Sequence, residues 1–183
     1  MKKLSRGFTL IEVLVVVLVI GILTSVALPH YQRSVLKSRL GSIMANTAEI
    51  GRALEVYYES HSHYPEDDDS TQSTLVIDIG ISGCSEATGG VFYCADATYD
   101  YEDKGLVGGF LLGYNGLGYV YYCSNSTSAW GAPDERQCWA DSTSKVANDV
   151  CVSLGGVLKG TNGWRAESYY KHTKGTWNVY TLH

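Results

Sequence analysis

The sequence lacks the motifs that carry most enzymatic chemistry. It contains no glycine-rich phosphate loop, no GxSxG turn and no HExxH motif. Its cysteines form no CxxC pair, which argues against a zinc ribbon. His30, His172 and His183 stand isolated along the chain. We therefore expect a protein that is not an enzyme and that needs no cofactor and no metal ion.

Basic residues are also scarce. The chain has 14 Lys and Arg against 19 Asp and Glu, which gives a formal net charge of −5. Proteins that bind DNA or RNA contact phosphates through clustered Lys and Arg, and no such cluster is visible. The composition therefore predicts no nucleic-acid binding.

Cysteine is absent from the first 83 residues and then occurs five times. If the C-terminal part is exported, these cysteines are expected to form disulfides in an oxidising compartment. The odd number leaves at least one of them outside an intrachain bridge. Two bridges among five cysteines allow about 15 pairing patterns, so the sequence alone leaves the connectivity open. The five are Cys84, Cys94, Cys123, Cys138 and Cys151.

The N-terminal segment contains the strongest signal in the chain. A short basic stretch, MKKLSRG, precedes the apolar run FTLIEVLVVVLVIGILTSVAL, which spans Phe8 to Leu28 and contains one charge, Glu12. A helix of this length is about 30 Å long and matches the core of a bilayer. Positive charge before the run predicts that residues 1–7 lie in the cytoplasm and that the rest of the chain lies outside.

Two ordinary interpretations of this segment compete with a specialised one. A secretory signal peptide has a shorter apolar region followed by a cleavage site of small residues, and neither holds here. A simple signal anchor remains open, but it does not explain Glu12. A carboxylate inside an apolar membrane helix is costly unless it is paired, so Glu12 is a candidate functional residue.

The string Gly7-Phe8-Thr9-Leu10-Ile11-Glu12 resembles the processing site of type IV prepilins and pseudopilins. This resemblance covers about the first 60 residues. It implies that a prepilin peptidase cuts between Gly7 and Phe8 and methylates the new amino terminus of Phe8. It also implies a precursor in the bacterial inner membrane, with one membrane pass and its C-terminal domain outside. The mature chain would then join a surface pilus as one of many copies, with the help of a pilus or secretion machinery.

The same resemblance assigns assembly roles within the apolar helix. Glu12 would neutralise the cationic amino terminus of a neighbouring subunit's Phe8, so that two costly charges become one pair. Gly21 and Pro29 both weaken a helix, and in the family they bracket a stretch that loses helicity in the filament. We carry that role over to residues 21–29.

After Pro29 the pattern becomes that of an amphipathic helix, which we expect to end near Ser60, before Tyr64-Pro65. Its apolar stripe needs a sheet to pack against, so the expected fold is α+β and pilin-like, with a long N-terminal helix on an antiparallel sheet. The stripe comprises Leu36, Leu40, Ile43, Thr47, Ile50, Leu54 and Tyr57. The expected organisation is a leader (1–7), a transmembrane or filament-core helix (8–29), an amphipathic half (30–64) and a β-rich head (65–183).

Short strands separated by Gly- and Asp-rich turns are expected in the head. The abundance of Tyr and Trp predicts a sheet with one face on the helix and one face wet. The expected strands are Leu75–Ile79, Val91–Cys94, Gly109–Tyr114, Tyr119–Cys123 and Trp177–Leu182. A short helix is expected over Val146–Leu154, with Gly155 as its cap.

Near the C-terminus, the stretch between Cys138 and Cys151 resembles the disulfide-bounded loop of many pilins. Cys84 and Cys94 have a similar spacing around Gly89-Gly90 and are favoured as the second pair. Cys123 would then be left over.

Two polar clusters invite a metal interpretation. His61-Ser62-His63 lacks nearby Cys, Asp or Glu at ligand spacing, so we interpret it as polar residues at a helix end. The acidic run Glu66 to Asp69 lacks the spaced ligands and glycine of a calcium loop, so a solvated loop is the better interpretation.

Three functions are compatible with these features. The first is a pilus subunit for adhesion, twitching motility or DNA uptake. The second is a pseudopilin of a type II protein secretion system. The third is a membrane-anchored minor pilin or adhesin. The cysteine-bounded C-terminal loop favours the pilus subunit.

Overall fold

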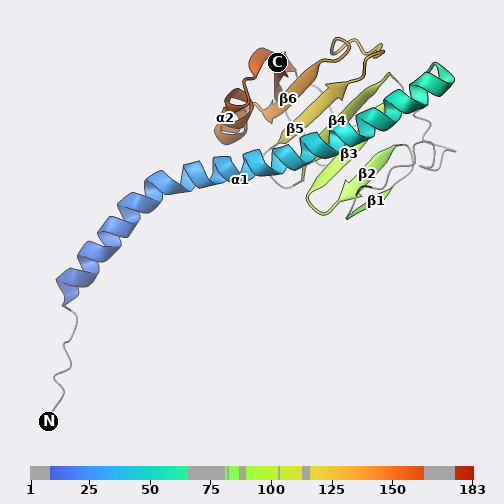
Figure 1. Cartoon of the computed structure of the whole chain (residues 1–183). Coiled ribbons are helices and arrows are strands. Elements are labelled where there is room, and N and C mark those ends of the chain that lie inside the picture. Colours follow the sequence, from blue (N-terminus) through green and yellow to red (C-terminus); the bar gives the residue numbers. More distant parts are fainter. Residues whose placement is uncertain are drawn as a thin grey trace.

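The structure is a computed structural model that describes residues 9–65, 81, 83–86, 90–102, 104–112, 116–162 and 176–183. Figure 1 shows one long helix, α1 (Leu10–His61), that extends far beyond a head built on a β-sheet. A short second helix, α2 (Lys145–Ser153), lies at the side of the head. The fold is α+β and pilin-like, as the sequence predicted.

Helix α1 has 52 residues and is therefore about 80 Å long. Thr9 caps its first turn, and its last turn ends at Ser62, whose φ of 62° is left-handed. The C-terminal half buries one stripe: Leu36, Leu40, Ile43, Thr47, Ile50, Gly51 and Leu54. This is the predicted stripe with Gly51 added, while Tyr57 is only partly buried.

Among the described residues, eight strands form one antiparallel sheet in the order β1-β2-β3-β4-β5-β6-β8-β7. Each strand pairs with its predecessor in the chain, except that β8 lies between β6 and β7. The strands are β1 (Cys84–Glu86), β2 (Val91–Cys94), β3 (Ala97–Glu102), β4 (Leu106–Leu111), β5 (Leu117–Tyr122), β6 (Arg136–Asp141), β7 (Val157–Asn162) and β8 (Trp177–Leu182).

One face of the sheet packs against the helices. Helix α1 lies on β3, β4 and β5, while α2 contacts β6, β8 and α1 itself. Because side chains alternate along a strand, Val107 of β4 and Tyr119 of β5 point into this first core. Gly109 of β4 lies directly beneath Ile43 and Thr47, so the helix approaches the sheet closely there.

The opposite face is also buried over the central strands, so the expectation of a wet face is wrong there. All six residues of β4 are buried. The alternate positions of β4, β5, β6 and β8 form a second, aromatic-rich core. In it Phe110 meets Trp139 and Trp177 edge to face, and the two tryptophan rings are tilted against each other. Its members are Leu106, Phe110, Val120, Tyr122, Trp139, Trp177 and Val179.

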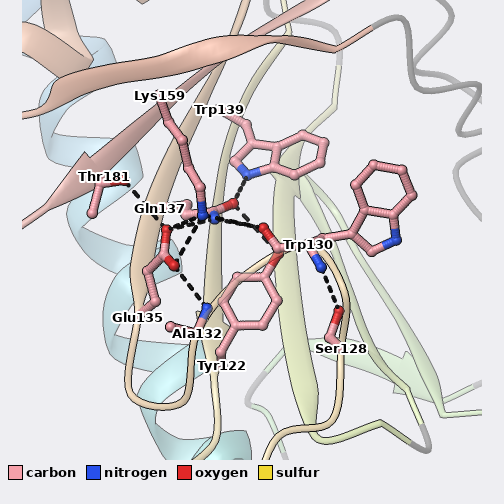
Figure 2. A network of polar contacts seen from close by, with 9 residues as sticks. All are labelled: Tyr122, Ser128, Trp130, Ala132, Glu135, Gln137, Trp139, Lys159 and Thr181. Atoms are coloured by element: carbon pink, nitrogen blue, oxygen red, sulfur yellow. Dashed lines mark hydrogen bonds and ion pairs between the residues drawn. The ribbon is translucent and has the colours of Figure 1, made fainter.

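A polar network borders this second core (Figure 2). Gln137 is fully buried, and its Oε1 accepts hydrogen bonds from the Trp139 indole at 2.8 Å and the Tyr122 hydroxyl at 3.4 Å. Its Nε2 donates to Glu135 at 2.8 Å and to the backbone carbonyl of Trp130 at 3.2 Å. These bonds satisfy the buried amide and fasten the loop before β6 to the sheet.

The strand predictions are only partly confirmed. The predicted bounds of β2 and β8 match the structure, and β4 and β5 begin two or three residues earlier than expected. Leu75–Ile79 lies outside the described residues. Strands β1, β3, β6 and β7 were not predicted, because charged and polar residues interrupt the apolar pattern of sequences such as ATYDYE and RQCWAD. Helix α2 lies where a short helix was expected, within one residue at each end.

Two disulfides cross-link the head. One joins Cys84 to Cys94, which are opposite each other on β1 and β2. The other joins Cys138 on β6 to Cys151 on α2, with an S–S distance of 2.00 Å. These are the two pairs that the sequence favoured. The remaining cysteine, Cys123, is a buried thiol.

Candidate assembly surface

The N-terminal half of α1 has no partner within the chain. Every residue from Leu10 to Leu28 is exposed, although nearly all are apolar. Its most apolar 18-residue window has a mean hydropathy of 2.8, and α1 is the one helix among the described residues long and apolar enough to cross a membrane. So large an exposed apolar surface requires either a bilayer or other helices around it.

Glu12 is held at the start of this helix by a capping box with Thr9. The Glu12 Oε2 atom accepts hydrogen bonds from the Thr9 backbone N–H at 2.8 Å and from the Thr9 hydroxyl at 2.6 Å. The Thr9 hydroxyl oxygen in turn accepts from the Glu12 backbone N–H at 3.4 Å. The carboxylate is thereby fixed beside the first turn, close in sequence to residue 8.

Sequence reasoning singled out Glu12 but gave no role to Thr9. The signal was present, because threonine followed three residues later by glutamate is the pattern of a capping box. Both bonds from Thr9 end on the same carboxylate oxygen, and among the described residues Oε1 of Glu12 accepts no hydrogen bond. The Oε1 atom is therefore free to accept a hydrogen bond from a donor on another chain. Gly7 and Phe8 lie outside the described residues.

Gly21 and Pro29 both lie within the continuous α1 helix. A Cβ on Gly21 would meet nothing within 4 Å, so this glycine is not required by packing within the chain. Pro29 lacks the N–H that would bond to the preceding turn. Figure 1 shows that α1 bends in its N-terminal half, before it reaches the head. In this structure residues 21–29 are helical.

Helix α2 is tied to α1 where α1 joins the head. Arg33 of α1 donates to Asp149 of α2 at 2.5 Å, and Lys37 donates to the backbone carbonyl of Ser153 at 3.4 Å. Lys145 donates to the same carboxylate oxygen of Asp149 at 2.9 Å. These hydrogen bonds from Lys145 and Arg33 lower the pKa of Asp149. The sequence gave no signal for the contact with Arg33, because the partners are 116 residues apart.

The other end of α1 is fastened to the loop that follows β5. Glu55 accepts hydrogen bonds from the backbone N–H of Ser124 at 2.6 Å and from its hydroxyl at 2.7 Å. The Tyr64 hydroxyl accepts from the backbone N–H of Asn125 at 3.2 Å. The C-terminal half of α1 is therefore held at both ends and belongs to the head, while the apolar half extends from it.

A metal centre with three or more protein ligands is not found among the residues that the structure describes. Within these parts of the chain, no group of three or more His, Cys, Asp or Glu side chains is placed to hold a metal ion. The feature that distinguishes the molecule is the exposed apolar half of α1.

Comparison with known proteins gives matches to the segment that contains this exposed helix. Residues 2–28 match the family model described as the prokaryotic N-terminal methylation motif. The N-terminal region is also similar to curated type IV pilins, which confirms the resemblance seen in the sequence.

The relatives match through their N-terminal parts. The type IV major fimbrial protein FimA of Dichelobacter nodosus is 44% identical over 55 residues, which is 30% of this chain and 35% of FimA. The type IV major pilin protein PilE of Neisseria gonorrhoeae is 36% identical over 70 residues, which is 38% of this chain and 42% of PilE. The chain therefore spans less than half the length of these relatives. No solved structure matches it.

Proposed function

We propose that this chain is a structural subunit of a type IV pilus, made as a membrane-inserted precursor and polymerised through the N-terminal half of α1. The observation that carries this proposal is the unpartnered apolar helix with one charge, Glu12, joined to a folded head. The similarity to type IV pilins over the same segment supports it. The relatives are structural proteins by name, which agrees with the lack of enzymatic motifs.

The proposed pathway begins with processing in the bacterial inner membrane. A prepilin peptidase cuts between Gly7 and Phe8, and the new amino terminus of Phe8 becomes N-methylated. The membrane first shields the apolar half of α1. Assembly machinery then transfers the helix from lipid into a bundle of identical helices, which is equally apolar.

Glu12 gives this bundle its register. Two apolar helices slide past each other with little change in energy, whereas a buried carboxylate must find a cation. In the filament the amino terminus of Phe8 from a neighbouring copy supplies that cation. It donates a hydrogen bond to the Oε1 atom of Glu12, which Thr9 does not use.

Residues 21–29, between a glycine and a proline, are the stretch of α1 proposed to lose helicity during packing.

Replacing Glu12 tests this mechanism. We expect Glu12→Ala to abolish filaments while cleavage continues, because the peptidase site at residues 7 and 8 is unchanged. Val15→Ala, three residues further along the same helix, is the matched control and should assemble. Intact mass reports the cleavage and the methyl group, and the yield of sheared filaments reports the assembly. Wild-type filament yield from Glu12→Ala would refute the pairing of charges.

A second experiment separates the pilus from its alternatives. Antibody against the head should label the whole shaft of a pilus if this chain is a major subunit. Labelling at the tip alone would indicate a minor pilin or adhesin. Loss of protein export without loss of surface filaments after deletion would instead indicate a pseudopilin. Gly7→Leu should block processing in each case.

A further inference from the structure

The C-terminal end of α1 gathers three aromatic rings from residues close in sequence. The His61 ring stacks on Tyr57, with centroids 4.0 Å apart and an interplanar angle of 10°. Ser62, in the left-handed conformation, turns the chain back so that His63 also meets Tyr57 edge to face at 5.8 Å. The two imidazole centroids are 6.0 Å apart, and both histidines are exposed. The turn therefore brings two solvent-accessible imidazoles together.

Hydrogen bonds determine which nitrogen of each neutral ring carries the proton. The Nδ1 atom of His61 lies 3.1 Å from the Tyr57 carbonyl oxygen, and the Nδ1 atom of His63 lies 2.8 Å from the Tyr64 carbonyl oxygen. A carbonyl oxygen only accepts, so these contacts favour the tautomer in which each Nδ1 is a donor. The Ser60 hydroxyl, which donates to the Tyr57 carbonyl at 2.8 Å, can accept from His61 Nδ1 at 2.7 Å as well. Each neutral ring is therefore left with its lone pair on Nε2.

Each ring has the hydrogen bonding that is common among metal-binding histidines. A histidine ligand commonly donates its other ring N–H to a carbonyl, which fixes the tautomer and orients the ring. Metal–nitrogen bonds of about 2.1 Å place two imidazoles on one ion with centroids about 5–6 Å apart, depending on the bond angle. The observed 6.0 Å lies at the upper end of that range. Stacking on Tyr57 restrains the His61 ring, and the carbonyl end of a helix favours a cation nearby.

We propose that His61 and His63 bind a divalent transition-metal ion through their two Nε2 atoms, with water completing the coordination. Imidazole nitrogens select nickel, copper and zinc over calcium and magnesium, which prefer oxygen ligands. The described residues contain no cluster of three potential ligands, so the two imidazoles are the protein ligands that we propose. The sequence favoured a plain polar helix end here, because it did not show that the Ser62 turn would place both rings against Tyr57.

Calorimetric titration of the full-length, tag-free chain in detergent with Ni²⁺ tests the proposal. We expect one site that is lost or weakened at least about tenfold in His61→Asn and in His63→Asn. His30→Asn and His183→Asn change exposed histidines away from the pair and should bind Ni²⁺ as the wild type does. Far-UV circular dichroism should show the same helix content in all five proteins.

The choice of ion provides a second criterion. Zn²⁺ should compete with Ni²⁺ for the site, and Mg²⁺ and Ca²⁺ should not. Wild-type affinity in His61→Asn or His63→Asn, or the same loss in His30→Asn, would overturn the proposal. Displacement of Ni²⁺ by Ca²⁺ would overturn it too. None of these measurements depends on filament assembly, so they stand apart from the test of Glu12.

Discussion

The Arg33 guanidinium and the Asp149 carboxylate meet at 2.5 Å, across 116 positions of sequence, where α1 enters the head. The side chains are 42% and 29% exposed, so solvent screens the pair only in part. Helix α2 is bound to the sheet by the Cys138–Cys151 disulfide. The ion pair therefore connects α1 to α2, and the disulfide connects α2 to strand β6 of the sheet.

Asp149→Ala should loosen this junction. We expect the free energy of unfolding to fall by about 0.5–1 kcal/mol, the upper range for partly exposed ion pairs. Adding Arg33→Ala to Asp149→Ala should lower the free energy of unfolding little further, because both changes remove the same interaction. Urea unfolding of the full chain in detergent measures both. The exposed Arg52–Glu49 pair on α1 is the control, and Glu49→Ala should have a smaller effect. Additive losses from the two junction variants would argue against the coupling.

Two glycines of α1 should respond oppositely to alanine. A Cβ on Gly41 would meet nothing within 4 Å, whereas a Cβ on Gly51 would lie 2.9 Å from the Tyr121 ring. Gly41→Ala should stabilise the head by about 0.5–1 kcal/mol, since alanine favours the helix. Gly51→Ala should destabilise it by about 1–3 kcal/mol, because the ring or the helix must move. Thermal unfolding of both variants measures the difference, and equal shifts in midpoint would contradict the close contact.

The predictable parts of this fold are those with a local cause. The helix stripe from Leu36 to Tyr57 follows from a simple repeat, and all of its predicted members except the half-buried Tyr57 are buried. Thr47 was included because of its position alone. The structure buries it completely above Gly109, with no hydrogen-bond partner for its hydroxyl among the described residues. Position on the helix face decided its burial more than polarity did.

The parts that escaped prediction depend on long-range contacts. Strand β6 was missed because it mixes Arg136 and Gln137 with apolar residues, and only its central place between β5 and β8 buries it. The second core was missed because alternation within one strand does not show whether another segment covers the outer face. At the candidate assembly surface Glu12 was predictable, whereas the contact of Arg33 with Asp149 required the folded chain.

Cys123 should be unreactive in the folded protein. Burial, reinforced by the nearby Glu55 charge, raises the pKa of its thiol to about 12, so almost no thiolate forms at pH 8. Iodoacetamide at pH 8 should therefore leave the native chain unmodified. In denaturant without reductant it should add one group, because the other cysteines are in disulfides. Mass spectrometry reads both states, and rapid labelling of the native chain would contradict the burial.

Glu135 should make the head sensitive to acid. Its side chain is 12% exposed and accepts hydrogen bonds from Lys159 at 2.7 Å, from the Ala132 backbone N–H and from Gln137, as Figure 2 shows. Burial alone would raise its pKa, but these donors outweigh burial and lower the pKa from 4.5 to about 2. A carboxyl group whose pKa is lower in the folded state stabilises the fold above its unfolded pKa. That contribution is lost as the pH falls from about 4.5 towards 2.

The size of the effect follows from the same shift. We expect Glu135 to contribute about 2 kcal/mol at pH 7, because screening around the half-exposed Lys159 reduces the full value. Glu135→Gln should lose most of this stability at pH 7 and little at pH 2.5, where the wild-type carboxyl is largely protonated in the unfolded chain and partly so in the folded one. Urea unfolding at both pH values measures the difference. An equal loss at the two pH values would show that the network stabilises through shape and not through charge.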